Sequence, residues 1–156
     1  MSIQIGHAAP DFTLFDSEKN SVQLSAFKGQ KVLLLFFPQS FTGVCTKELC
    51  SVRDNIALYN GTDAKVFGIS VDSVFTLGKF KEEQSLNFPL LSDFNKVVSE
   101  QYGSIYHDWI LDMKGVSKRS AFVIDREGNV QYAEVLDNAG EVPNFEKINA
   151  VLQELA

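Results

Sequence analysis

The chain contains two cysteines, Cys45 and Cys50, which lie just beyond an apolar run. A proline and a threonine precede them in the pattern Pro38-x-x-x-Thr42-x-x-Cys45. Apolar residues recur at helical spacing after Thr42, so Cys45 is expected in the first turn of a helix that follows a strand. Backbone N–H groups at that end of a helix lack partners and stabilise negative charge. The pattern therefore predicts a reactive thiolate, the form of cysteine that acts as a nucleophile.

The other two residues of this pattern each have a physical role in such a site. Pro38 ends the strand and presents an apolar ring without an N–H donor, which would shield a reactive sulfur from water. Thr42 is the expected N-cap of the helix. Its hydroxyl is able to accept a hydrogen bond from the first turn, or to donate one toward the sulfur or a substrate oxygen.

Ionisation of the thiol is too small an effect to account for catalysis. An ordinary thiol with a pKa of about 8.5 is roughly 3% ionised at neutral pH, so complete ionisation gains only about 30-fold, or about 2 kcal/mol. Enzymes typically lower barriers by about 8 kcal/mol or more. Other groups must therefore stabilise the charge that develops when a thiolate attacks its substrate. The N–H groups of Val44 and Cys45, the Thr42 hydroxyl and an arginine would supply those hydrogen bonds.

The elements that must hold this site follow from apolar periodicity. Residues 31–37 contain six consecutive apolar residues between Gly29 and Pro38, which is typical of a strand buried on both faces. The other predicted elements are a hairpin (10–16 and 21–25), a helix (42–59), a strand (65–72), a helix (73–83), an extended segment that Pro89 keeps out of a central ladder (87–93), a short helix (96–102), a loop with helical turns (103–118), a hairpin (120–125 and 130–135) and a last helix (144–155).

This order of elements predicts an α/β protein. It resembles the thioredoxin fold, with an N-terminal β-hairpin extension, a mid-chain insertion and a mixed central sheet flanked by helices. At 156 residues, 45% of them hydrophobic, the chain fits a single domain spanning residues 1–156. A single domain of this size is expected to hold one active site.

Charge and the N-terminal residues limit the class of protein further. The net charge of −6, with 14 Lys and Arg spread along the chain, argues against nucleic acid or an anionic membrane as a partner. The chain does not start with a basic stretch followed by a long apolar one, so we expect a cytoplasmic protein. In that reducing compartment the two cysteines are not expected to form a permanent bridge. No cofactor or metal is expected.

Several further segments occur in the order and spacing of one family, and together they cover nearly the whole chain. They are Gly6-x-x-Ala-Pro-Asp-Phe12, Phe36-Phe37, Glu48, Gly68-Ile-Ser-Val-Asp72, Phe88-Pro-Leu-Leu-Ser-Asp93 and Arg119-x-x-Phe-Val-Ile-Asp125. With these segments and the cysteine pattern, the sequence resembles the peroxiredoxins, the thiol-specific antioxidant and alkyl hydroperoxide reductase family.

The resemblance implies a thiol-dependent peroxidase with assigned residues. Cys45 would be the peroxidatic cysteine, oxidised to sulfenic acid by hydrogen peroxide or an alkyl hydroperoxide. Thr42 and Arg119 would orient and activate the peroxide, and Pro38 would shield the site. Glu48 would hydrogen-bond to Arg119 and position it.

The role of Cys50 stays open between two subgroups. Its spacing from Cys45 resembles the bacterioferritin-comigratory-protein-like subgroup, in which a resolving cysteine lies five residues on in the same helix. Other parts of the chain resemble one-cysteine-type bacterial peroxiredoxins. An intact helix would hold the two Cα atoms roughly 8–9 Å apart, whereas a disulfide needs less than about 7 Å. Cys50 would therefore resolve the sulfenic acid only if the helix unwinds by a turn or two, and is otherwise structural.

The expected partners are small molecules and proteins. The resemblance implies a hydroperoxide substrate and, as reductant, thioredoxin, glutaredoxin or a low-molecular-weight thiol. The aromatic residues Phe41, Tyr106 and Trp109 favour a homodimer formed through the loops around the site.

Three other functions use the same residue types. A thioredoxin-like disulfide reductase would carry Cys-x-x-Cys, whereas four residues separate these cysteines. A copper carrier would use both cysteines and a histidine, for which His7 and His107 are the candidates. A thiol-based peroxide sensor or redox relay would use the same Cys45. Sustained turnover of peroxide separates an enzyme from such a sensor, which reacts once and stalls.

Overall fold

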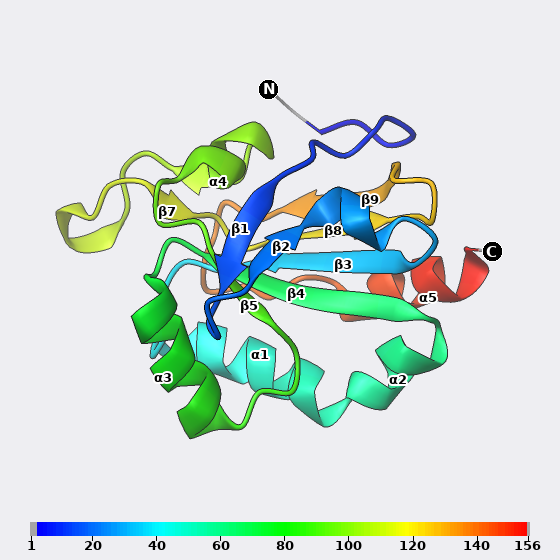
Figure 1. The fold of residues 1–156 in the computed structure, drawn as a ribbon. Coiled ribbons are helices and arrows are strands. Elements are labelled where there is room, and N and C mark those ends of the chain that lie inside the picture. The colour runs from blue at the N-terminus through cyan, green and yellow to red at the C-terminus, as the bar shows by residue number, and fades with distance from the viewer. Residues whose placement is uncertain (1–2, 156) are drawn as a thin grey trace.

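The computed structural model describes residues 3–155, which are organised around a seven-stranded sheet (Figure 1). Its strands are β1 (Thr13–Asp16), β2 (Ser21–Gln23), β3 (Lys31–Phe36), β4 (Ala64–Ser70), β5 (Leu90–Ser92), β8 (Ser120–Ile124) and β9 (Val130–Val135), in the spatial order β2-β1-β5-β4-β3-β8-β9. The strands β3, β4 and β5 run parallel, and the other neighbours are antiparallel. The predicted α/β class, the mixed sheet and both hairpins are confirmed.

Helices cover both faces of the sheet. The helices α1 (Gly43–Asp54), α2 (Ile56–Gly61), α3 (Val74–Gln84) and α5 (Phe145–Glu154) share one core, and α4 (Val97–Gln101) belongs to the core of the opposite face (Figure 1). A 3₁₀ turn at Leu24–Phe27 also lies on the α4 side. Within residues 3–155, no helix has the length and apolar character needed to cross a membrane.

The central strand β3 supplies both cores. Leu33 and Leu35 pack with the helices of one face, while Leu34 and Phe36 pack into the core of the other face. All six residues of the strand are buried. Successive side chains of a strand point to opposite faces, so an unbroken apolar run is what a strand in this position requires. The prediction of a strand buried on both faces is confirmed.

The predicted helix over residues 42–59 is wrong in one respect, because it breaks after Asp54. Asn55 leaves helical geometry (φ −116°, ψ 19°), and its side-chain Nδ2 donates to the carbonyl of Ser51 at 2.8 Å. Asparagine side chains compete in this way with the hydrogen bonds of the helix and favour helix ends. The helix that carries both cysteines therefore ends shortly after Cys50.

Two other segments differ from the expectation. Pro89 was expected to exclude residues 87–93 from the centre of the sheet, yet β5 lies between β1 and β4. The proline stands just before the strand and uses only its carbonyl, which accepts from Gly68 N–H at 3.0 Å. The predicted loop at 103–118 contains a 3₁₀ turn (Ile110–Asp112) and also a two-stranded ladder of β6 (Ile105–Tyr106) and β7 (Val116–Ser117), which is too short to produce a periodic pattern.

Lys31, the first residue of β3, hydrogen-bonds to the last helix. The side chain of Lys31 is buried, and its Nζ donates to the carbonyl of Leu152 in α5 at 2.8 Å. Carbonyl groups in the last turn of a helix lack partners within the helix, and a cation there is favourable. A lysine that the sequence places at the edge of an apolar run is therefore an internal link between β3 and α5.

Lys31→Met should lower the free energy of unfolding by about 1–3 kcal/mol, because it removes a charged hydrogen bond while keeping an apolar side chain. Urea denaturation measures this loss. The control is Lys65→Met, which changes a partly exposed lysine opposite Val32 on the neighbouring strand and should stay within about 0.5 kcal/mol of wild type. Equal losses in the two variants would contradict the proposed link.

Candidate active site

The site forms where β3 ends and α1 begins. Pro38 is buried directly after the strand, and Cys45 lies in the first turn of α1 with 1% of its surface exposed. Leu49 and Val52, which follow at helical spacing, belong to the same core as Cys45. Both cysteines are free thiols. The thiol of Cys45 is thus held at the positive end of a helix and out of water, as the sequence predicts.

Arg119 reaches this thiol from the start of β8, the strand next to β3. In the antiparallel register of β3 and β8, Ser120 lies opposite Phe36, so the preceding Arg119 stands beside the end of β3. Its Nη2 donates to Cys45 Sγ at 3.2 Å and its Nη1 to Glu48 Oε1 at 2.7 Å. Its Nε and Nη2 also donate to the carbonyl of Ala139, at 3.1 and 3.0 Å. The structure therefore brings Cys45, Glu48 and Arg119 together.

Burial governs the electrostatics of these groups. Arg119 is 1% exposed and Glu48 2% exposed. Burial raises the pKa of Glu48 to about 7, although the charge and hydrogen bond of Arg119 lower it. Burial lowers the pKa of Arg119, but the negative charges of Cys45 and Glu48 outweigh this and raise it overall. The guanidinium is therefore a permanent buried cation between two acids.

Thr42 occupies the predicted N-cap position but does not act as a capping side chain. Its hydroxyl accepts no hydrogen bond from the first turn and instead donates to the carbonyl of Gln39 at 2.8 Å. The loop supplies this acceptor because the chain turns sharply at Phe41, whose φ is +65°. The N-cap position of Thr42 is confirmed, but the side-chain capping bond is not formed, and the hydroxyl oxygen is left as an acceptor near the mouth of the site.

Asp72, at the end of β4, anchors this loop. Its Oδ2 accepts from the N–H and the hydroxyl of Ser40, both at 2.9 Å, and from the hydroxyl of Ser70 at 2.6 Å. Asp72 was expected only as part of a family segment, with no role of its own. A signal was present, because an aspartate directly after a buried parallel strand lies at the same edge of the sheet as the end of β3.

A hollow of about 750 Å³ opens in front of the thiol. It is lined by Thr42, Gly43, Val44, Cys45, Tyr106, Asp108, Trp109, Ile110, Arg119, Asp137, Asn138, Ala139 and Gly140. Tyr106 and Trp109 stack with their ring centres 6.2 Å apart, and Lys118 lies over Tyr106 while pairing with Asp137 at 2.8 Å. One wall of the hollow is thus aromatic. The segment that carries Tyr106 and Trp109 has no periodic pattern in the sequence that would predict how these rings are placed.

Cys50 is not directed at Cys45. It is half-buried, and its Sγ donates to Gln84 Oε1 of α3 at 3.5 Å.

The two histidines are exposed, and His107 lies 3.9 Å from Glu100. Within residues 3–155, His, Cys, Asp and Glu side chains form no group of three or more that would hold a metal ion. The described geometry thus offers no support for the copper carrier.

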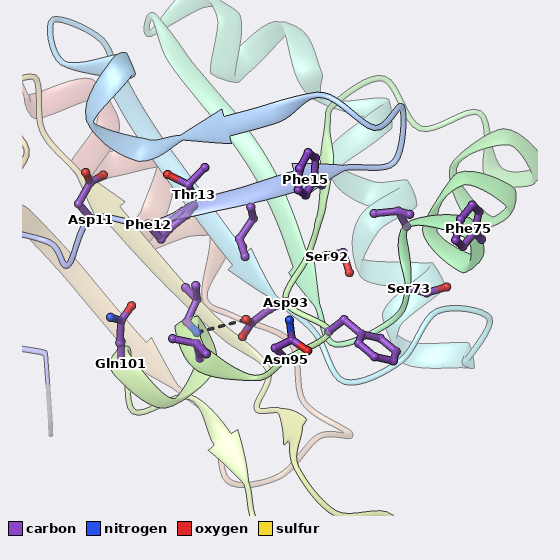
Figure 2. A pocket seen from close by; sticks show the side chains of 15 residues that line it. Asp11, Phe12, Thr13, Phe15, Ser73, Phe75, Ser92, Asp93, Asn95 and Gln101 are labelled. Atoms are coloured by element: carbon purple, nitrogen blue, oxygen red, sulfur yellow. Dashed lines mark hydrogen bonds between the residues drawn. The ribbon is translucent and has the colours of Figure 1, made fainter.

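A second hollow lies elsewhere, between β1, the start of α3 and the loop before α4 (Figure 2). Its volume is about 630 Å³, and none of the predicted site residues line it. Phe15, Phe75 and Phe94 border it with 57%, 72% and 60% of their surface exposed. Asp93 at its base accepts at 3.2 Å from the N–H of Val98, in the first turn of α4 (Figure 2). Its polar group is therefore already satisfied.

Comparison with known proteins gives matches along most of the chain. The sequence matches the AhpC/TSA family over residues 5–133. It is 38% identical over 143 residues to alkyl hydroperoxide reductase E of Mycobacterium tuberculosis, covering 90% of each chain. It is 42% identical over 130 residues to a putative peroxiredoxin bcp of Coxiella burnetii, covering 82% of this chain and 85% of that protein. The crystal structure of peroxidoxin BcpB of Mycobacterium tuberculosis matches with a TM-score of 0.85 at 31% identity, covering 97% of each chain.

Asp72→Ala should lower the free energy of unfolding by about 3 kcal/mol, because it leaves an N–H group and two hydroxyls without their acceptor. Ser40→Ala removes only one of the three bonds and should cost about 1 kcal/mol. Denaturant titration of both variants measures the difference. If Asp72→Ala proves no less stable than Ser40→Ala, the carboxylate does not anchor the loop.

Proposed function

Since the chain belongs to the AhpC/TSA family of peroxiredoxins and is therefore a thiol-dependent peroxidase, we propose that Cys45 is the thiol that attacks the peroxide and becomes a sulfenic acid. The observation that supports this most strongly is the contact of 3.2 Å between Arg119 Nη2 and Cys45 Sγ, with both side chains 1% exposed. A buried cation held on a thiol at a helix N-terminus stabilises the thiolate.

The reaction needs stabilisation of charge on the peroxide as well as on sulfur. As the S–O bond forms and the O–O bond breaks, negative charge moves to the leaving oxygen. The guanidinium of Arg119 and the first-turn N–H groups of Val44 and Cys45, residues that line the hollow, would donate to the reacting oxygens. The Thr42 hydroxyl donates its hydrogen bond to the carbonyl of Gln39, so its oxygen would accept from the O–H of the peroxide. These contacts would orient the peroxide toward the sulfur.

The substrates proposed are hydrogen peroxide and alkyl hydroperoxides. The hollow in front of Cys45 admits both, since one wall carries polar donors and the other carries the stacked rings of Tyr106 and Trp109. Apolar tails of organic hydroperoxides would pack on those rings. The similarity to a protein named alkyl hydroperoxide reductase E supports the same substrates.

Two routes would return Cys45 to the thiol. In one, Cys50 condenses with the sulfenic acid to give an intramolecular disulfide, which requires α1 to unwind because Cys50 points toward Gln84 of α3. In the other, thioredoxin, glutaredoxin or a low-molecular-weight thiol reduces Cys45 directly. The free state of both thiols in this structure fits the starting point of either route.

We also infer that the enzyme is a homodimer formed through the loops around the site. Phe41 is 49% exposed while its ring rests on Phe80 of α3, and Ile110 at the hollow's rim is 60% exposed. Exposed apolar side chains that cluster around a site are characteristic of a surface that another chain covers.

Cys45→Ser should abolish steady-state peroxide consumption with every reductant, because the nucleophile is lost. Arg119→Lys should reduce kcat/KM by about 100-fold, because a single ammonium cannot make all the hydrogen bonds that the guanidinium makes to the sulfur, to Glu48 and to the carbonyl of Ala139. Consumption of hydrogen peroxide and an alkyl hydroperoxide with thioredoxin, glutaredoxin or dithiothreitol measures both effects. Activity surviving in Cys45→Ser would refute the assignment, and a single stoichiometric reaction without turnover would indicate a sensor.

Treatment of the wild type with stoichiometric peroxide distinguishes the two routes. If Cys50 resolves, non-reducing mass analysis should show the loss of two hydrogens and circular dichroism the loss of helix, because α1 must open to form the bridge. Cys50→Ser should then accumulate Cys45 with added oxygen and keep its helical signal. If the wild type also accumulates oxidised Cys45 beside a free Cys50, the one-cysteine route is the correct one.

A further inference from the structure

The cluster around Arg119 contains one cation and two acids. The guanidinium bonds Cys45 Sγ and Glu48 Oε1, and all three side chains are at most 2% exposed. A single guanidinium compensates one negative charge. Two anions at once would leave excess negative charge in a dry environment, where water does not screen it. The cluster therefore favours states in which only one of the two acids is ionised.

The second oxygen of Glu48 indicates which acid carries the proton. Glu48 Oε2 is buried and has no hydrogen-bond partner among the residues that the structure describes. A carboxylate accepts hydrogen bonds at both oxygens, and leaving one of them unpaired in a dry interior costs more than burying a neutral carboxyl. This arrangement suits a carboxyl whose Oε1 accepts from Arg119 while Oε2 holds the proton.

Among residues 3–155, the ionisable neighbours of Glu48 leave one competitor for its proton. The groups that face it are Cys45 from its own helix, Arg119 from the link between β7 and β8, and Tyr59 from α2. Burial, and after it the charge of Glu48, raises the pKa of Tyr59 to about 12, so this phenol stays neutral near pH 7. Burial raises the pKa of Glu48 itself to about 7. Cys45 and Glu48 therefore share one guanidinium.

We propose that Glu48 is protonated while Cys45 is a thiolate, and that it becomes a carboxylate when Cys45 is oxidised to a neutral sulfenic acid. The inference rests on the proposed role of Cys45. Glu48 does not touch the substrate in this scheme and is a positioning residue that acts through Arg119. Its charge follows the redox state of the sulfur.

The atoms and charges of this step balance. The thiolate attacks the terminal oxygen of R–O–OH, the O–O bond breaks, and the products are Cys45–SOH and the alkoxide RO⁻. The sulfur donates an electron pair to the O–O bond, so Cys45 is oxidised and the peroxide is reduced. The alkoxide takes a proton from solvent while Glu48 releases one to solvent, which gives ROH and a Glu48 carboxylate. One negative charge has moved from Cys45 to Glu48, and Arg119 keeps one anionic partner throughout.

Infrared spectroscopy of the reduced protein near pH 7 tests this, because a protonated carboxyl has a carbonyl stretch that a carboxylate lacks. We expect such a band, shifted by isotopic labelling of glutamate carboxyl carbons and lost in Glu48→Gln. In a Cys50→Ser background, one equivalent of peroxide should remove the band as mass spectrometry records one oxygen added to Cys45. In Cys45→Ser, which has no thiolate, the midpoint of the band's titration should fall by about one pH unit or more.

Glu134→Gln is the matched control, because Glu134 is a partly exposed carboxyl on β9 that pairs with Tyr132 and lies outside the cluster. It should leave the band unchanged. If Glu48→Gln does not fold, the isotope shift and Cys45→Ser still decide the question. The inference is overturned if the reduced protein shows no glutamate carboxyl band, if the band survives oxidation of Cys45, or if its midpoint is unchanged in Cys45→Ser. If peroxide adds no oxygen to Cys45, the proposed function fails too.

Discussion

The buried guanidinium of Arg119 is the constraint on which the rest of the site depends. A charge removed from water is tolerable only when its donors are occupied, and breaking such an arrangement by removing one partner costs about 3–5 kcal/mol. Here the partners come from two turns of α1 and from the chain beyond β9, at Ala139. The register of β3 and β8 holds the arginine at their meeting point. One cation thus bonds three groups from two segments, α1 and the chain beyond β9.

The thiol site could be predicted from sequence because its parts are local. The apolar run, the proline, the threonine and the cysteine are consecutive along the chain, so a strand, a loop and a first helical turn follow from periodicity and capping rules. Family resemblance then supplied Arg119, which is 74 residues away from Cys45 and is not distinguishable from other basic residues by pattern alone. The thioredoxin-like architecture and the family were both confirmed by the comparisons.

What sequence reasoning missed depends on which hydrogen-bond partner a side chain takes. The direction of the Thr42 hydroxyl is decided by a carbonyl of its own loop, and the break at Asn55 by a side chain that bonds back to Ser51. The burial of Lys31 requires the end of α5 to lie across β3. In each case the residue type allowed two local outcomes, and a partner far away or a competing hydrogen bond selected one of them.

The break at Asn55 makes α1 a short helix of 12 residues between a sharp turn at Phe41 and a second helix. Helices of this length are marginal on their own, so α1 persists because of its packing and not because of its sequence. Such an element is a unit of partial unfolding, which opens at less cost than the whole domain while the sheet stays intact. Helix–coil transitions take about a microsecond or less. Both thiols therefore lie on a helix short enough to unfold and re-form quickly.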